Sequence, residues 1–162
     1  MEKKTKQRLY LYGLLFVALL AQVSFMGRAA WCPDLILLVV VFTGIFWGAK
    51  EGFTLGLVAG FLRGCFSPNM FPLDIILFSA VGAASAVMAK MFYRQNPSAQ
   101  MFTAAVATLA VILAHTLYQN ALSGNDIELS LVIYSSRRTL ISTVFVAPLL
   151  FVPLQGWLKL EE

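Results

Sequence analysis

Four residues could do polar chemistry within largely apolar sequence: Asp34, Arg63, Asp74 and His115. A short Ser-Pro-Asn linkage brings the segments of Arg63 and Asp74 together, so an ion pair between them is geometrically possible. Asp34 and His115 are predicted at the same membrane level, on the outer side. We call these four residues the outer polar cluster. It is either a structural clasp or the floor of a ligand or partner site.

These residue types form no recognisable catalytic or metal centre. His115 is the only histidine, and no cysteine or carboxylate stands at metal-ligand spacing from it. The sequence has no activated serine or cysteine and no GxxxxGK[ST], HExxH or CxxC motif. We therefore expect no enzymatic activity, no metal and no cofactor, and interpret His115 as a histidine satisfied by its neighbours at the membrane interface.

Glycine recurs at every fourth position through two neighbouring apolar segments. The part of this repeat that falls on one helix, which we call the glycine ladder, is Gly52, Gly56, Gly60 and Gly64. Glycines four apart lie nearly above one another on a helix and let a second backbone approach closely. The ladder either packs inside the bundle, with the small residues of 80–86 as the expected partner face, or docks the helix of another protein.

The composition requires that these residues be positioned by membrane helices. Hydrophobic residues make up 59% of the 162 residues, and charged residues make up 12%, about half the usual share of a globular domain. So few charges cannot cover the surface of a soluble domain of this length. The twelve Lys and Arg are spread between apolar runs, which argues against a nucleic-acid-binding face.

Six apolar runs predict an all-α integral membrane protein with a single transmembrane domain over residues 1–162. The runs are 9–26, 34–48, 53–66, 73–92, 101–117 and 140–158. The second and third are short for a membrane core of about 30 Å, so they extend into their flanks, or one is partly re-entrant or sheltered inside the bundle. The centre of the longest connection, 126–134, is expected to lie at the membrane surface as a short helix or strand.

The basic residues predict the orientation of the bundle, because cytoplasmic loops carry the excess of Lys and Arg. An even number of crossings puts both termini on one side. That side carries eight of the twelve basic residues: Lys3, Lys4, Lys6, Arg8, Lys50, Lys90, Arg94 and Lys159. The other side carries Arg28, Arg63, Arg137 and Arg138. Both termini are therefore predicted to be cytoplasmic.

Several of these features combine into a recognisable pattern over residues 33–94. Pro33, Asp34 and Leu35 open the second segment, Gly48 and Gly52 mark a tight turn, and Gly56, Gly60-Phe61 and Gly64 follow in the third segment. This pattern resembles the family of the rod shape-determining protein MreD. Members of that family often carry an aspartate about four residues after the last glycine. Pro68 stands there in this chain, so the role of that aspartate is not transferred.

The resemblance implies a non-enzymatic scaffold in the cytoplasmic membrane of a bacterium, within the cell-elongation machinery that supports peptidoglycan synthesis and cell shape. The implied partners are membrane lipid, MreC and, through MreC, RodA, a class B penicillin-binding protein and MreB. No cofactor and no nucleic acid are implied. The alternative is the substrate-binding subunit of an energy-coupling factor vitamin transporter, which is similar in size and hydropathy. Its usual Ala-xxx-Ala pattern is missing from the first helix, where Ala18 and Ala21 are three apart.

Overall fold

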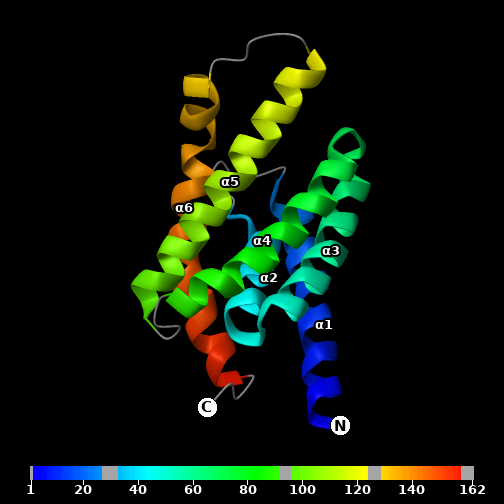
Figure 1. Cartoon of the computed structure of the whole chain (residues 1–162), viewed down its shortest axis with the longest axis vertical. Coiled ribbons are helices and arrows are strands. Elements are labelled where there is room, and N and C mark those ends of the chain that lie inside the picture. The colour runs from blue at the N-terminus through cyan, green and yellow to red at the C-terminus, as the bar shows by residue number, and fades with distance from the viewer. Residues whose placement is uncertain (1, 27–32, 92–95, 124–128, 158–162) are drawn as a thin grey trace.

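The computed structural model describes residues 2–26, 33–91, 96–123 and 129–157, and every regular element within these ranges is a helix (Figure 1). The α-helices are α1 (Glu2–Met26), α2 (Leu35–Trp47), α3 (Ala49–Phe66), α4 (Phe71–Met91), α5 (Pro97–Ser123) and α6 (Leu129–Trp157). A 3-10 turn, η1 (Pro68–Met70), joins α3 to α4. The prediction of an all-α bundle is confirmed.

Successive helices run in alternating directions, so the first turn of α1 and the last turn of α6 lie at the same end of the bundle (Figure 1). We call this the terminal end, and the opposite end, where α3 leads into α4, the far end. Along the bundle, α3 and α4 form one close pair and α5 and α6 form another.

Four helices are long and apolar enough to cross a membrane. The candidate spans are Gln7–Ser24, Pro68–Met91, Pro97–Leu122 and Ser136–Gly156. The two helices outside this group, α2 and α3, are those for which the sequence predicted short segments. With 13 residues, α2 is only about 20 Å long.

The short helix α2 is sheltered inside the bundle. Every residue from Ile36 to Ile45 is buried, and Leu38, Val41 and Phe42 have no exposed surface. Each of the other five α-helices contacts it. A helix that is apolar on all sides fits such a central position, because none of its faces has to meet a polar solvent. The sequence left open whether the second segment extends into its flanks, is partly re-entrant or is sheltered inside the bundle, and the structure shows that it is sheltered.

The helix boundaries differ from the apolar runs mainly at turns and outer ends. Gly48 separates α2 from α3 and has a φ of 95°, a left-handed conformation that glycine adopts without strain, so α3 begins at Ala49 instead of residue 53. The sixth helix begins at Leu129 instead of residue 140. Residues 129–134 therefore belong to α6, and the predicted surface element is wrong there; residues 126–128 lie outside the described ranges.

Candidate functional site

The glycine ladder faces α4 along its whole length. A Cβ atom added at Gly56 would overlap the backbone carbonyl of Phe78, and one added at Gly60 would overlap the carbonyl of Asp74. At Gly64 the added atom would lie 2.6 Å from the Phe71 ring. Backbone contact therefore holds α3 against α4, the helix that was expected as its partner. Of the small residues of 80–86, however, only Gly82 meets the ladder, opposite Gly52, while Ser85 and Ala86 face Gly44 of α2. Because α4 already fills this face, another protein's helix has no room on it.

This close packing positions two charged residues of the outer polar cluster. Asp74 lies in the first turn of α4, opposite Gly60, and has no exposed surface. Arg63 lies in the last turn of α3, and its side chain is 19% exposed. Its guanidinium carbon is 5.1 Å from the centre of the Phe78 ring, a cation–π contact that also comes from α4. Both charges therefore sit at the far-end half of the α3–α4 contact.

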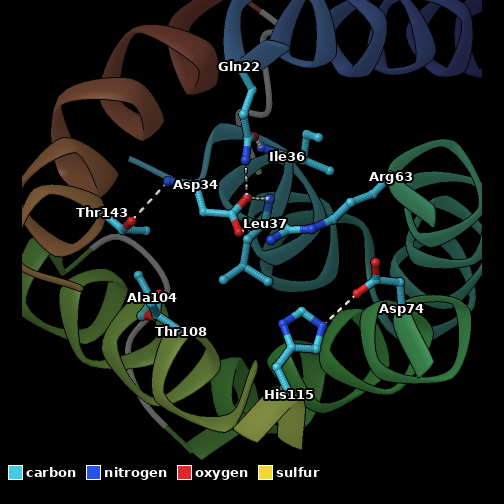
Figure 2. Close-up of polar contacts among 10 residues, drawn as sticks. All are labelled: Gln22, Asp34, Ile36, Leu37, Arg63, Asp74, Ala104, Thr108, His115 and Thr143. Atoms are coloured by element: carbon cyan, nitrogen blue, oxygen red, sulfur yellow. Dashed lines mark hydrogen bonds and ion pairs between the residues drawn. The ribbon is translucent and has the colours of Figure 1, made fainter. Parts of the chain in front are cut away.

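Asp34 is the centre of the polar contacts (Figure 2). It precedes the first turn of α2, where one carboxylate oxygen accepts the Leu37 N–H at 3.1 Å as a helix N-cap. The other oxygen lies 2.5 Å from an Arg63 guanidinium nitrogen. The Gln22 amide also donates to the carboxylate at 3.4 Å, and the Asp34 N–H donates to the Thr143 hydroxyl at 3.0 Å. One residue thus connects α1, α2, α3 and α6.

The second carboxylate of the cluster, Asp74, contacts α5. One of its oxygens lies 2.7 Å from Nε2 of His115, and the other is buried without a hydrogen-bond partner among the described residues. The close ion pair of Arg63 is therefore with Asp34 and not with Asp74, although Asp74 lies near enough to interact electrostatically with the guanidinium. The short turn brings the helix ends together, but the arginine reaches across the bundle to the N-terminus of α2, while Asp74 turns towards α5 (Figure 2).

These contacts form two groups, one around Asp34, which caps α2, and one between Asp74 and His115. Together they take one residue from each α-helix or its cap, and we call the set the six-helix polar network. Its members are Gln22, Asp34, Arg63, Asp74, His115 and Thr143. The sequence analysis missed Gln22 and Thr143, which are 4% and 0% exposed. Gln22 offered a signal, because an amide within an apolar membrane segment needs a partner inside the bundle. Thr143 offered no such signal, since a threonine hydroxyl can form its hydrogen bond with the backbone of its own helix.

The arrangement brings opposite charges together and offers hydrogen bonds between helices. Gln22 illustrates this, because its amide oxygen accepts the Ile36 N–H at 3.2 Å while its amide nitrogen donates to Asp34. Within the described ranges, no group of three or more His, Cys, Asp or Glu side chains is placed to hold a metal ion.

Comparison with models of known protein families matches residues 4–160 to the family described as rod shape-determining protein MreD. The chain belongs to the MreD family. The match extends well beyond residues 33–94, where the pattern of glycines and Pro-Asp-Leu resembled this family, so that resemblance is confirmed. No match was found among the curated proteins or among the solved structures that were compared.

Membership of the MreD family indicates that the six-helix polar network belongs to a membrane protein. The family supports a role in the determination of rod shape, and the apolar helices indicate a membrane protein. In such a protein, polar contacts between helices are valuable because lipid offers no competing hydrogen bonds, and each costs free energy if left unmade. The network therefore ties α1, α3 and α6 to the start of α2, and α4 to α5, in this MreD-family protein.

Proposed function

We propose that this chain is a non-enzymatic scaffold subunit of the bacterial cell-elongation complex, which supports peptidoglycan synthesis and the regulation of cell shape. The observation that carries the proposal is the MreD family match over residues 4–160. The helical bundle is consistent with it, because its polar side chains are used to hold helices together. The same match favours the scaffold over the vitamin-transporter subunit.

The proposal places the protein in the cytoplasmic membrane as a multi-pass bundle of about six transmembrane helices with both termini in the cytoplasm. The alternating helix directions and the shared end of α1 and α6 support an even number of crossings (Figure 1). The excess of Lys and Arg predicted for that side supports a cytoplasmic terminal end. The six-helix polar network then lies towards the outer half of the membrane.

The partners we propose are membrane lipid, MreC and, through MreC, RodA, a class B penicillin-binding protein and MreB. Since the glycine ladder is covered by α4, contact with a membrane partner falls to the outward faces of the other helices. These faces expose large apolar side chains, among them Phe16 on α1, Leu117 on α5 and Leu149 on α6. Such surfaces suit either lipid or the transmembrane helix of a partner.

The long helices α5 and α6 offer a second contact region. With 27 and 29 residues they are about 40 and 44 Å long, whereas a membrane core is about 30 Å thick. In Figure 1 their connected ends stand at the far end of the bundle. In the proposed orientation this end faces the outside of the cell, where the wall is built.

Purification from the native membrane tests the proposal. The full chain, carrying an affinity tag, is extracted in mild detergent, and the proteins that accompany it are identified by mass spectrometry. Recovery of a single-span shape protein together with wall-synthesis enzymes supports the scaffold. Recovery of ATPases with a large membrane coupling subunit overturns it in favour of a transporter. As an independent readout, depletion of the protein should turn rod-shaped cells round.

A further inference from the structure

An open groove lies between α1 and α6 in the terminal-end half of the bundle. It is lined by Leu14 of α1 and by Leu150, Pro153 and Leu154 of α6, and its volume is about 300 Å³. The three α6 residues share one face of that helix, because they are three and four positions apart. The groove walls expose almost no polar surface. A polar occupant would lose its hydrogen bonds there, so the occupant has to be apolar.

The two helices that border the groove are held together only in the other half of the bundle. Both pack against α2, and within the described ranges they make few contacts with each other. Towards the far end, Gln22 of α1 and Thr143 of α6 are linked through their hydrogen bonds with Asp34. The groove opens in the terminal-end half, where its apolar walls cannot form such a link.

The groove lies at the depth of acyl chains in one leaflet of the membrane. The candidate span of α1 begins at Gln7, and Leu14 lies about 10 Å further along the helix. The candidate span of α6 ends at Gly156, and Leu150 lies about 9 Å before it. Half of a membrane core is about 15 Å thick. The groove is therefore within the hydrocarbon of the leaflet at the terminal end.

The length of the groove favours an acyl chain over a helix. From Leu150 to Leu154 it covers about 6 Å of α6, which is little more than one helical turn. The transmembrane helix of a partner, or of a second copy of this chain, would need contact along much of the membrane core of about 30 Å. A flexible acyl chain fits a short groove that opens towards the lipid.

The start of α1 supplies positive charge at the height of the lipid headgroups. Lys3, Lys4 and Lys6 lie in the first two turns of α1, where Glu2 offsets one of their charges. Position 3 is on the same face of the helix as Leu14, three turns or about 16 Å before it. It is thus about 6 Å outside the start of the span, within a headgroup layer of about 5–8 Å.

The other charges at the terminal end leave it positive. Arg8 and Glu51 neutralise each other, and Lys50 and Lys90 of the neighbouring helices are exposed. The three charged residues that follow α6 lie outside the described ranges and add one negative charge: Lys159, Glu161 and Glu162. We propose that the groove binds one acyl chain of an anionic phospholipid, whose phosphate lies at the height of Lys3. This inference rests on the membrane placement proposed above and not on the scaffold role.

Native mass spectrometry of the purified full chain tests the choice of lipid. Phosphatidylglycerol, which is anionic, or phosphatidylcholine, which is zwitterionic, is added to the detergent, and the bound molecules are counted. We expect one saturable site that prefers phosphatidylglycerol. Lys3→Gln should reduce this preference about fivefold, the share of one lysine near an anionic headgroup. Equal affinities of the wild-type protein for the two lipids overturn the proposal.

A variant that fills the groove tests the place of binding. Leu14→Trp should abolish the saturable site, whereas Leu20→Trp, the same change at a position of α1 that is 52% exposed, should retain it. Unchanged phosphatidylglycerol binding by a folded Leu14 variant overturns the proposal, and loss of a co-purifying protein or of a dimer by that variant would then assign the groove to a helix. If this variant does not fold, the Lys3 variant decides. Because lipid binding is measured on the isolated protein, failure of the scaffold proposal leaves this result unaffected.

Discussion

Helix α3 carries an ion pair near each end, and the two pairs differ in their surroundings. At the terminal end, Glu51 pairs with Arg8 of α1, whose side chain is 55% exposed. At the far end, Arg63 pairs with Asp34, whose side chain is 8% exposed and accepts further hydrogen bonds. Exposed pairs contribute about 0–1 kcal/mol, whereas removal of one partner from a buried pair costs roughly 3–5 kcal/mol.

The comparison shows that burial and additional hydrogen-bond partners decide how much an ion pair contributes to the stability of the folded protein. Both pairs connect α3 to a helix earlier in the chain, so their topological roles are alike. Only the far-end pair is enclosed, because the glycine ladder draws α4 over it and places Phe78 beneath the guanidinium. We therefore expect the far end to determine the stability of the bundle, and the terminal end to tolerate change.

The largest loss of folded protein is expected from a substitution in the closely packed α3–α4 contact at the far end. In Gly60→Leu the new side chain would overlap the backbone carbonyl of Asp74, which no side-chain rotation can relieve, so folded protein should be lost. Size-exclusion chromatography of the detergent-extracted protein measures this. The matched control is Gly13→Leu, because a Cβ atom at Gly13 meets nothing within 4 Å. Normal yield of the Gly60 variant would show that backbone contact is not required.

Removal of the far-end carboxylate should have the next largest effect. Asp34→Ala leaves Arg63 without its partner and removes the N-cap of α2, so the free energy of unfolding should fall by about 3–5 kcal/mol. Equilibrium unfolding in bicelles provides the measurement. Asp34→Asn is the control, since it retains the capping oxygen and should lose less. A loss below about 1 kcal/mol for the alanine variant would place this pair in the same class as the exposed one.

A smaller effect is expected from a neutral member of the six-helix polar network. Gln22→Leu removes one donor to Asp34 and leaves the buried Ile36 N–H without its acceptor, so we expect destabilisation of about 1–3 kcal/mol. The same unfolding measurement applies, with Val23→Leu, on the exposed side of α1, as the control. Equal stability of the two variants would show that α1 is held by apolar packing alone.

The smallest effect is expected at the terminal end. Arg8→Ala should change the free energy of unfolding by less than about 1 kcal/mol, because water already solvates both partners. Addition of salt should abolish even this difference, whereas the far-end pair should be insensitive to salt. Unfolding at low and high ionic strength distinguishes the two ends. A loss at Arg8 as large as that at Asp34 would refute the comparison.

Features that depend on periodicity along the chain could be predicted from the sequence. Apolar runs gave the six helices, because each must satisfy its backbone groups internally in lipid. The repeat of Gly52 to Gly64 predicted a close helix contact, and its partner helix was predicted as well. The face was not, because the ladder meets residues 71–82 and, of the small residues of 80–86, only Gly82. The four charged or titratable residues of the cluster were found because such groups are rare in apolar sequence.

Features that depend on side-chain direction could not be predicted. The choice of Arg63 between two nearby carboxylates is set by how α2 and α4 present them across the bundle, which no local pattern records. The central place of α2 follows from contacts with all five other helices, three of which, α4, α5 and α6, are distant in sequence. The early start of α6 was missed because hydropathy locates the apolar part of a helix and not the end of its hydrogen bonds.

The burial of α2 also determines what surrounding lipid can detect. Since Ile36 to Ile45 are covered by other helices, a photoactivatable reagent dissolved in the acyl chains would label exposed positions such as Leu9, Ile76 and Leu149 and leave Ile36 to Ile45 unlabelled. The buried part of this helix, although the helix is the most apolar of the six, therefore has no contact with the surrounding lipid. Changes in membrane thickness or composition can reach it only through its neighbours.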